Sequence, residues 1–207
     1  GNPKGVLYSH RSSMLHGLSV IQPDVFALSS KAVSLPIVPM FHAVGWGMPF
    51  SAPMVGMKLV FSAVYDGKVL CELLNREKVT HTAGVPTVWL AMFQHMDATG
   101  EAPQHLKLVT IGGSAAPRAM IERIMKMGVQ VIHAWGMTET SPLGTAGAPS
   151  WGWDELTFEQ QLNRSVYQGR PPFGVELRVV DDSGAVHPRD GKSSGRLQVR
   201  GPWVLKQ

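Results

Sequence analysis

The feature that most constrains the fold is a repeated alternation of short β-type segments with helical patterns. Strand-like segments rich in Val, Ile and Leu are expected at 32–38, 58–61, 79–82, 106–111 and 129–135. Amphipathic helical spacing is expected between them, at 66–78, from Pro86 onward and from Pro117 onward. Strands that alternate with helices are typical of a sheet covered on both faces. The sequence therefore predicts an α/β fold with a doubly wound, mostly parallel sheet and flanking helices.

The pattern changes after Ser141. Three glycines predict a loop over 142–153, and 154–163 has the composition of a short helix. The segments 175–180 and 197–200 alternate like exposed strands. We therefore expect a boundary near Tyr167, with an α/β part over 1–166 and, over 167–207, the incomplete β-rich start of a barrel-like subdomain.

Charge and composition exclude several classes of protein. The net charge is +4, and the Lys and Arg residues are scattered, so the sequence predicts no nucleic-acid partner. Residues 32–57 carry no Lys, Arg, Asp or Glu, but they contain four prolines and three glycines. Each internal proline costs a helix roughly 3 kcal/mol. This segment is therefore expected to form a buried strand, a loop and a short helix, and no transmembrane segment is predicted.

Cysteine usage indicates the redox environment. The single cysteine, Cys71, excludes an internal disulfide and favours a reducing compartment. It lies in a helical pattern between Leu70 and Leu73, which is typical of a buried structural thiol. We therefore expect a cytoplasmic protein, with peripheral association with a membrane left open.

Residues 129–141 bring polar chemistry to the end of a predicted strand. Gly136 allows the backbone to turn sharply, and Thr138 and Glu139 follow at once. In an open parallel sheet, ligands bind beyond the carboxyl ends of the strands. A hydroxyl can donate to a phosphate oxygen and a carboxylate can bind Mg²⁺, while Trp135 offers a flat apolar face to a purine. A capped loop with solvated Thr138 and Glu139 is the alternative interpretation.

Three further loops carry candidate residues, each with an ordinary structural alternative. The turn Gly112-Gly-Ser-Ala-Ala-Pro117 leaves room for a base against the backbone, although close helix–strand packing explains it equally well. Lys4 in Gly1-Asn-Pro-Lys-Gly5 is placed to hold a phosphate, or it is a solvated lysine of a surface turn. His42 lies between apolar residues, as at the mouth of an apolar pocket, or it is a satisfied loop histidine.

Five motifs occur in order along the chain: Gly1–Gly5, Pro39-Met-Phe-His42, Gly112–Pro117, Trp135-Gly-Met-Thr-Glu-Thr140 and Gly195-Arg-Leu-Gln-Val-Arg-Gly201. Together they resemble the core motifs of the adenylate-forming enzymes, the superfamily of acyl-CoA synthetases, luciferases and peptide-synthetase adenylation domains. Two segments, 38–46 and 82–90, look most like the medium- and long-chain fatty acid–CoA ligases. The resemblance covers essentially the whole chain.

The resemblance implies a reaction in two steps. A carboxylic acid attacks the α-phosphate of ATP to give acyl-AMP and pyrophosphate, and the thiol of CoA then displaces AMP. The implied small molecules are a fatty acid, ATP or AMP, Mg²⁺ and CoA as co-substrate. Residues 1–166 would be the nucleotide- and acyl-binding part of a large adenylation domain.

The resemblance also implies roles for individual residues. The catalytic residues would be Lys4, His42, Thr138 and Glu139, with Glu139 binding the metal. The nucleotide would contact Gly1, Lys4, Gly113, Ser114, Ala115, Ala116, Ala134, Trp135, Gly136, Met137 and Thr138. The acyl group would lie along His42, Trp46, Val85, Gly112 and Gly113.

The sequence departs from the family pattern in two respects. Trp135 stands where many members have Tyr, so N–H replaces O–H beside a retained stacking face. The start of the phosphate loop would precede Gly1, and the ribose-binding aspartate, the hinge and the C-terminal lid with its catalytic lysine would follow Gln207. We therefore interpret the chain as a central fragment that is inactive alone and binds nucleotide weakly at most.

Two other functions stay open at this point. The protein could adenylate an acid and pass the acyl group to a carrier protein, or it could be a catalytically silent binding or scaffold fragment. A homodimer, the acyl chain length and the pathway are left open as well.

Overall fold

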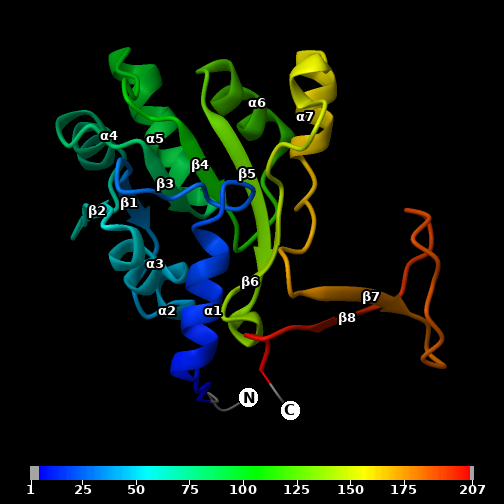
Figure 1. The fold of residues 1–207 in the computed structure, drawn as a ribbon. Coiled ribbons are helices and arrows are strands. Elements are labelled where there is room, and N and C mark those ends of the chain that lie inside the picture. Colours follow the sequence, from blue (N-terminus) through cyan, green and yellow to red (C-terminus); the bar gives the residue numbers. More distant parts are fainter. Residues whose placement is uncertain (1–4, 206–207) are drawn as a thin grey trace.

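A computed structural model describes residues 5–205, so Gly1 and Lys4 of the predicted phosphate loop lie outside the described residues. Six strands form one sheet in the order β2–β1–β3–β4–β5–β6 (Figure 1). The first five run parallel, and β6 runs antiparallel to β5. Their bounds are β1 (Val33–Ile37), β2 (Lys58–Leu59), β3 (His81–Gly84), β4 (Leu108–Ile111), β5 (Gln130–Gly136) and β6 (Leu143–Ala146). The predicted α/β fold with a mostly parallel sheet is confirmed.

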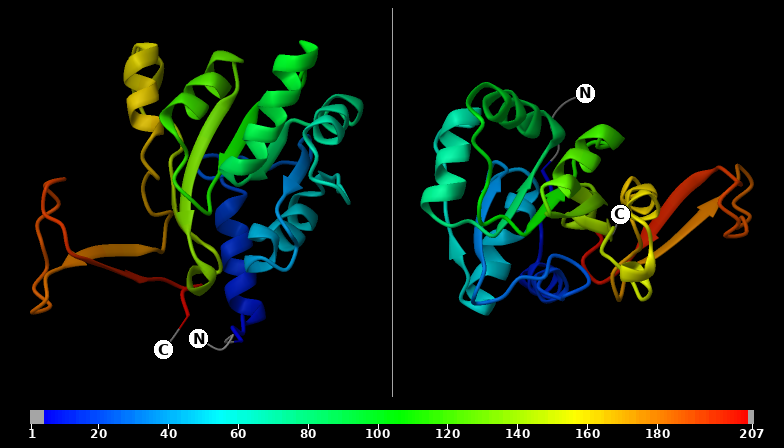
Figure 2. Two further views of the ribbon diagram at one scale, coloured as in Figure 1. Left: turned by 180° about the vertical axis from the view of Figure 1, so that it is seen from behind. Right: turned by 90° about the horizontal axis from the view of Figure 1, so that it is seen from above.

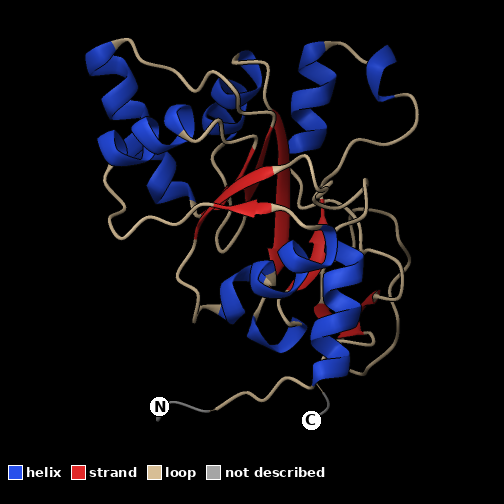
Figure 3. Ribbon diagram, turned by 60° about the vertical axis from the view of Figure 1, so that its left-hand side comes forward, coloured by secondary structure: helices blue, strands red, loops and turns tan. Residues whose placement is uncertain are grey.

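Helices cover both faces of this sheet (Figures 2 and 3). One face carries α1 (His10–Val20), α2 (Ala43–Trp46) and α3 (Met48–Val55), and the other carries α4 (Gly67–Arg76), α5 (Pro86–Thr99) and α6 (Arg118–Lys126), with α7 (Phe158–Ser165) beside α6. Local chemistry sets several helix starts. The Asp66 carboxylate accepts from the first backbone N–H groups of α4, and α5 begins at Pro86.

The hydrophobic core consists of two layers, one on each face of the sheet. The larger layer packs α4, α5 and α6 against the strands through fully buried side chains such as Trp89, Leu70 and Ile121. The second layer places α1 and α3 against the other face, with Val20, Phe26 and others buried. Cys71 lies in the larger layer, where burial raises the pKa of its thiol to about 11, in agreement with a structural role.

The chain ends in a separate ribbon. Strands β7 (Glu176–Val180) and β8 (Arg196–Arg200) pair antiparallel with each other and project from the six-stranded sheet (Figure 1). Most of their side chains are exposed or half-buried. The division of the chain near Tyr167 stays a prediction. No helix within residues 5–205 is both long and apolar enough to cross a bilayer.

One predicted element is wrong, and several boundaries move. The expected loop over 142–153 contains β6, because Leu143–Ala146 pairs with the end of β5 although Thr145 is the one β-branched residue in that strand. A short 3-10 helix, η2 (Trp153–Glu155), follows it. Strand β3 begins at 81 instead of 79, β2 ends at 59, and α7 begins at 158 instead of 154 because Thr157 caps it.

The face of α1 that packs on the sheet differs from the one its apolar spacing suggests. The spacing of Met14, Leu15 and Leu18 marks an apolar stripe, but Met14 and Leu18 are exposed. The helix instead buries small and polar residues, among them His16 and Gly17. A Cβ at Gly17 would lie 2.8 Å from the Met54 Cε atom of α3, so the Met54 side chain packs directly on the glycine.

Candidate active site

Loops from the carboxyl ends of β1, β4 and β5 surround one cavity of about 260 Å³. The predicted site residues that line it are His42, Trp46, Gly112, Gly113, Ala134, Trp135, Gly136, Met137, Thr138 and Glu139. Val85 flanks Gly113, and Ser114, Ala115 and Ala116 continue the same turn. The two glycines of the small-residue turn and the Thr138–Glu139 pair thus lie around one cavity. The roles assigned to these residues stay predictions.

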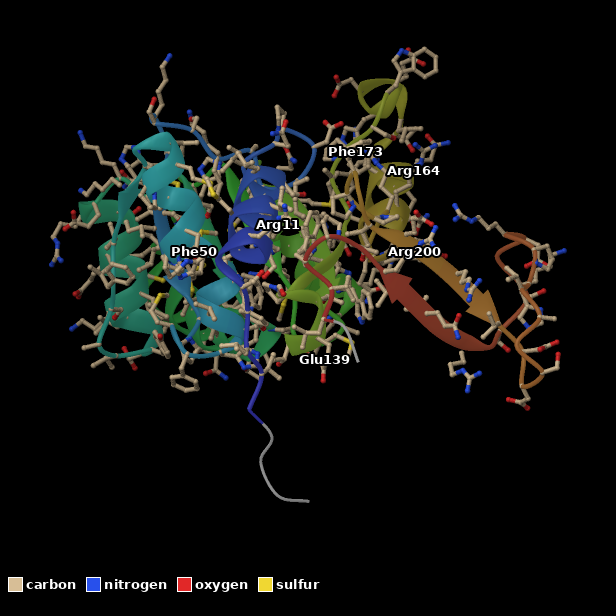
Figure 4. All side chains as sticks on the ribbon, turned by 60° about the horizontal axis from the view of Figure 1, so that its bottom comes forward. Arg11, Phe50, Glu139, Arg164, Phe173 and Arg200 are labelled. Atoms are coloured by element: carbon tan, nitrogen blue, oxygen red, sulfur yellow. The ribbon has the colours of Figure 1, made fainter. Side chains whose placement is uncertain are left out.

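The turn after β5 presents Thr138 and Glu139 to solvent. Residues Thr138–Thr140 form a single 3-10 turn, η1, and Thr140 is fully buried within it. The Met137 N–H donates to the Pro142 carbonyl at 3.0 Å and to Thr140 Oγ1 at 2.9 Å, which closes the turn. Glu139 projects outward at the edge of the molecule (Figure 4). The Thr140 side chain is therefore used in hydrogen bonds within the turn, whereas the Thr138 hydroxyl and the Glu139 carboxylate remain available to a ligand.

The surroundings of Glu139 are suited to a magnesium ion that is coordinated by one protein carboxylate and, for the rest, by the phosphates of a bound substrate and by water. Among the described residues, no cationic side chain lies within ion-pair distance of Glu139, and no three His, Cys, Asp or Glu side chains converge on a metal-sized site. Mg²⁺ is usually held by one or two carboxylates together with substrate phosphates and water. One free carboxylate at the edge of this cavity is consistent with that coordination.

Tyr8 joins the first described segment to this turn. Its hydroxyl donates to the Thr138 carbonyl at 2.6 Å. Burial, followed by the nearby charge of Glu139, raises the pKa of the Tyr8 phenol, so the hydroxyl stays protonated and remains a donor. Sequence reasoning did not single out Tyr8, since a tyrosine four residues after Lys4 has no distinctive spacing.

The apolar side of the cavity is built on an unusual backbone. All four residues of α2 have positive φ, from 41° at Ala43 to 55° at Trp46. For a residue with a side chain this left-handed conformation costs roughly 1–2 kcal/mol. The turn buries the Trp46 indole against Gly112, where an added Cβ would lie 3.1 Å from the ring. It leaves His42, the residue before α2, exposed at the mouth.

The opposite side of the cavity is framed by Trp135 and the small-residue turn. The Trp135 indole packs on the backbone of Gly144 in β6, where any added Cβ would overlap the ring. Behind the turn, His133 Nε2 accepts the Ala116 N–H at 3.2 Å while Nδ1 lies 3.0 Å from the Val166 carbonyl. Because the carbonyl can only accept, Nδ1 carries the proton. Burial lowers the pKa of His133, which favours this neutral form.

His16 is a second histidine that sequence reasoning missed. It lies on α1, lines the cavity and is almost fully buried. Its Nε2 atom accepts the Leu143 N–H at 3.4 Å, and its ring packs on Gly47, where a Cβ would lie 2.6 Å from the imidazole. Burial lowers its pKa to about 4. In sequence it is one polar residue within a helix, so no pattern identifies it.

The buried His16 makes stability depend on pH. Its pKa in the folded state, about 4, lies below the value of about 6.5 expected in the unfolded chain. The unfolded state therefore binds more protons between these values, and the free energy of unfolding falls as the pH drops below 6.5. At pH 5, the change at His16 alone should lower the free energy of unfolding by about 2 kcal/mol. Urea unfolding of wild type and His16→Gln at pH 7 and pH 5 measures it, and an equal pH dependence in both proteins would contradict this prediction.

A mostly parallel sheet with helices on both faces and a cavity at the carboxyl ends of its strands is typical of α/β domains that bind ligands at that edge. A family profile described as AMP-binding enzyme matches residues 1–207. The chain belongs to this family.

The relatives found by sequence are acyl-CoA ligases. The medium-chain-fatty-acid–CoA ligase of Ectopseudomonas oleovorans is 48% identical over all of this chain and 38% of its own length. The 3-methylmercaptopropionyl-CoA ligase of Ruegeria pomeroyi and the long-chain-fatty-acid–CoA ligase of Thermus thermophilus are each 44% identical, with 99% of this chain and 38% of their own lengths covered. The chain thus spans well under half the length of these relatives.

Solved structures show the same fold. A long-chain-fatty-acid-CoA ligase from Archaeoglobus fulgidus superposes with a TM-score of 0.82 at 24% identity, covering 98% of this chain and 40% of that one. The O-succinylbenzoate Coenzyme A synthetase from Bacillus subtilis, in a complex with ATP and magnesium ion, gives a TM-score of 0.81 at 24% identity and covers 100% of this chain and 40% of its own.

Proposed function

We propose that the protein is a fatty acid–CoA ligase that activates a medium- or long-chain carboxylic acid with ATP and Mg²⁺ and transfers the acyl group to CoA. One observation carries this proposal. A single cavity combines an exposed hydroxyl and carboxylate, Thr138 and Glu139, with an apolar wall that contains Trp46 and Leu143. An acid with an alkyl chain and a nucleoside triphosphate need both kinds of surface side by side. The sequence relatives are named as ligases that form CoA thioesters of carboxylic acids.

The first step joins the acid to AMP. A carboxylate oxygen of the acid attacks the α-phosphorus of ATP, and the bond to the β-phosphate oxygen breaks to release pyrophosphate. Thr138 would donate to a phosphate oxygen, and Trp135 with the turn 114–116 would hold the adenine. Mg²⁺, held by Glu139 and the phosphates, would supply positive charge against the leaving group. Lys4, outside the described residues, would add a second positive charge.

The second step transfers the acyl group. The CoA sulfur attacks the acyl carbonyl carbon, the bond to AMP breaks, and the thiol proton is lost to solvent. His42, which lines the cavity and is exposed, would contact the carboxylate end of the acid. We further propose that the protein is cytoplasmic, that residues 167–207 begin a second subdomain, and that a homodimer is compatible with these roles.

Pyrophosphate release tests this proposal in the natural full-length protein. ATP, Mg²⁺ and acids of increasing chain length are supplied, with and without CoA. Release that requires a medium or long acid, with thioester formed when CoA is present, supports the ligase. Release without CoA, followed by transfer of the acyl group to a carrier protein, would show instead that the protein is an adenylating enzyme that serves a carrier protein. No release with any acid would leave the binding or scaffold role.

Trp46 should limit the length of the acyl chain. Its buried indole closes the apolar side of the cavity against Gly112. Trp46→Ala removes this wall, so kcat/KM for longer acids relative to shorter ones should rise about tenfold, since one methylene in an apolar pocket is worth about that factor or more. The chain-length series measures the ratio. Trp151→Ala, at a tryptophan that is 94% exposed, is the control and should leave the ratio unchanged.

A further inference from the structure

The segment that follows β8 is bonded to the turn that carries Thr138 and Glu139. The Leu205 N–H donates to the Glu139 carbonyl at 2.9 Å. The Ser141 hydroxyl donates to the Trp203 carbonyl at 2.5 Å, and the Trp203 indole N–H donates to the Leu143 carbonyl at 2.9 Å. Three hydrogen bonds therefore connect segments that lie about 60 residues apart in the sequence. They reach the middle of the turn at Glu139 and the residues that follow it, Ser141 and Leu143.

Trp203 is the centre of this contact. Its side chain is 3% exposed, and its ring meets the His16 ring edge-on with centroids 5.9 Å apart. His16 accepts the Leu143 N–H while Trp203 donates to the Leu143 carbonyl. Both backbone polar groups of one residue are thus bonded by two side chains from remote segments. The first residue of β6 is fixed between α1 and the segment after β8.

These hydrogen bonds bear on Glu139 because few interactions of its own side chain fix its position. The carboxylate is exposed and has no cationic partner among the described residues, so its position depends on the backbone of a three-residue 3-10 turn. A carboxylate that binds a metal loses affinity when the groups that orient it are removed. The bonds from 203–205 hold the Glu139 carbonyl and the far end of the turn, and Tyr8 holds the Thr138 carbonyl.

We propose that Trp203 is a positioning residue for the Glu139 carboxylate, so that the segment after β8 sets the affinity of the site for magnesium-bound nucleotide. The inference rests on the proposed function, because it assigns Glu139 to the metal. It concerns binding, and it can be tested without turnover.

The test compares ATP binding to the natural full-length protein with Mg²⁺ and with EDTA, by isothermal titration calorimetry. Trp203→Phe keeps an aromatic ring at this position but removes the indole N–H and part of the ring volume, whereas Ser141→Ala removes the hydroxyl bond to the same residue. Each variant should reduce the gain in affinity that Mg²⁺ confers, by about tenfold. Affinity for ATP in EDTA should stay within about twofold of wild type, since the adenine-binding groups are untouched.

The controls separate positioning from general destabilisation. Trp151→Phe, at an exposed tryptophan, should leave the Mg²⁺ effect unchanged. A Mg²⁺ effect equal to wild type in both site variants, or equal losses of affinity with and without Mg²⁺, would overturn the inference. If wild type binds ATP with no Mg²⁺ effect at all, the assignment of Glu139 in the proposed function fails instead.

Discussion

Replacing Glu139 with glutamine is expected to lower the rate of acyl-adenylate formation by about 100-fold or more, because removing one preorganised electrostatic group at a reacting phosphate typically costs 10²–10³ in rate. The amide keeps the size and leaves the turn intact, since the Glu139 side chain makes no hydrogen bond or ion pair with another described residue. Its charge is lost, so the Mg²⁺ concentration needed for half-maximal pyrophosphate release should rise as well. The rate is measured as pyrophosphate release at saturating acid.

Glu155→Gln is the matched control for this change. Glu155 is also an exposed glutamate in a short 3-10 helix, but it lies on η2, away from the cavity. The Glu155→Gln variant should release pyrophosphate at the wild-type rate. If Glu139→Gln kept more than about a tenth of the wild-type rate, an electrostatic role of the size expected for a metal ligand would be excluded.

Gly136→Ala should be the most damaging single-methyl change to the fold near the site. A Cβ at this position would overlap the backbone carbonyl of Pro142, which is part of the hydrogen bond that closes the turn. Backbone cannot move aside as a flexible side chain can, so β5 and the turn must separate. We expect the free energy of unfolding to fall by at least about 3 kcal/mol.

Urea unfolding at pH 7 measures this loss, with Gly5→Ala as the control. An added Cβ at Gly5 meets no atom of the residues that the structure describes within 4 Å, so that variant should unfold within about 0.5 kcal/mol of wild type. A change of less than about 1 kcal/mol in Gly136→Ala would mean that the contact between Gly136 and Pro142 is not as close as described.

The sheet could be predicted from the sequence because its strands are short apolar runs separated by clear turn residues. Strand β4 is buried along its whole length, so its hydrophobic run is unambiguous. The loops at the strand ends could be predicted for the same reason, since parallel strands deliver their carboxyl ends to one edge. His42, Gly112 and Thr138 each follow such a strand, and all three line the same cavity.

The features that could not be predicted from the sequence depend on contacts between residues far apart in the chain. Strand β6 is rich in small residues and exists because it pairs with β5, which a local pattern does not show. The left-handed backbone at Ala43 and Val44 is imposed by packing, since neither residue favours it. His16, His133 and Trp203 act through partners 17 to 127 residues away. Nothing in their own sequence neighbourhood identifies them.

A crystal structure of the natural full-length protein with a non-hydrolysable acyl-adenylate analogue, in which a sulfamoyl group replaces the phosphate, tests the central claim most directly. We expect the adenine against Trp135 and residues 114–116, the sulfamoyl group beside Thr138, and the alkyl chain along Trp46 and Gly112. An analogue bound elsewhere on the protein, or bound in this cavity with its adenine on the Trp46 side, would contradict the account.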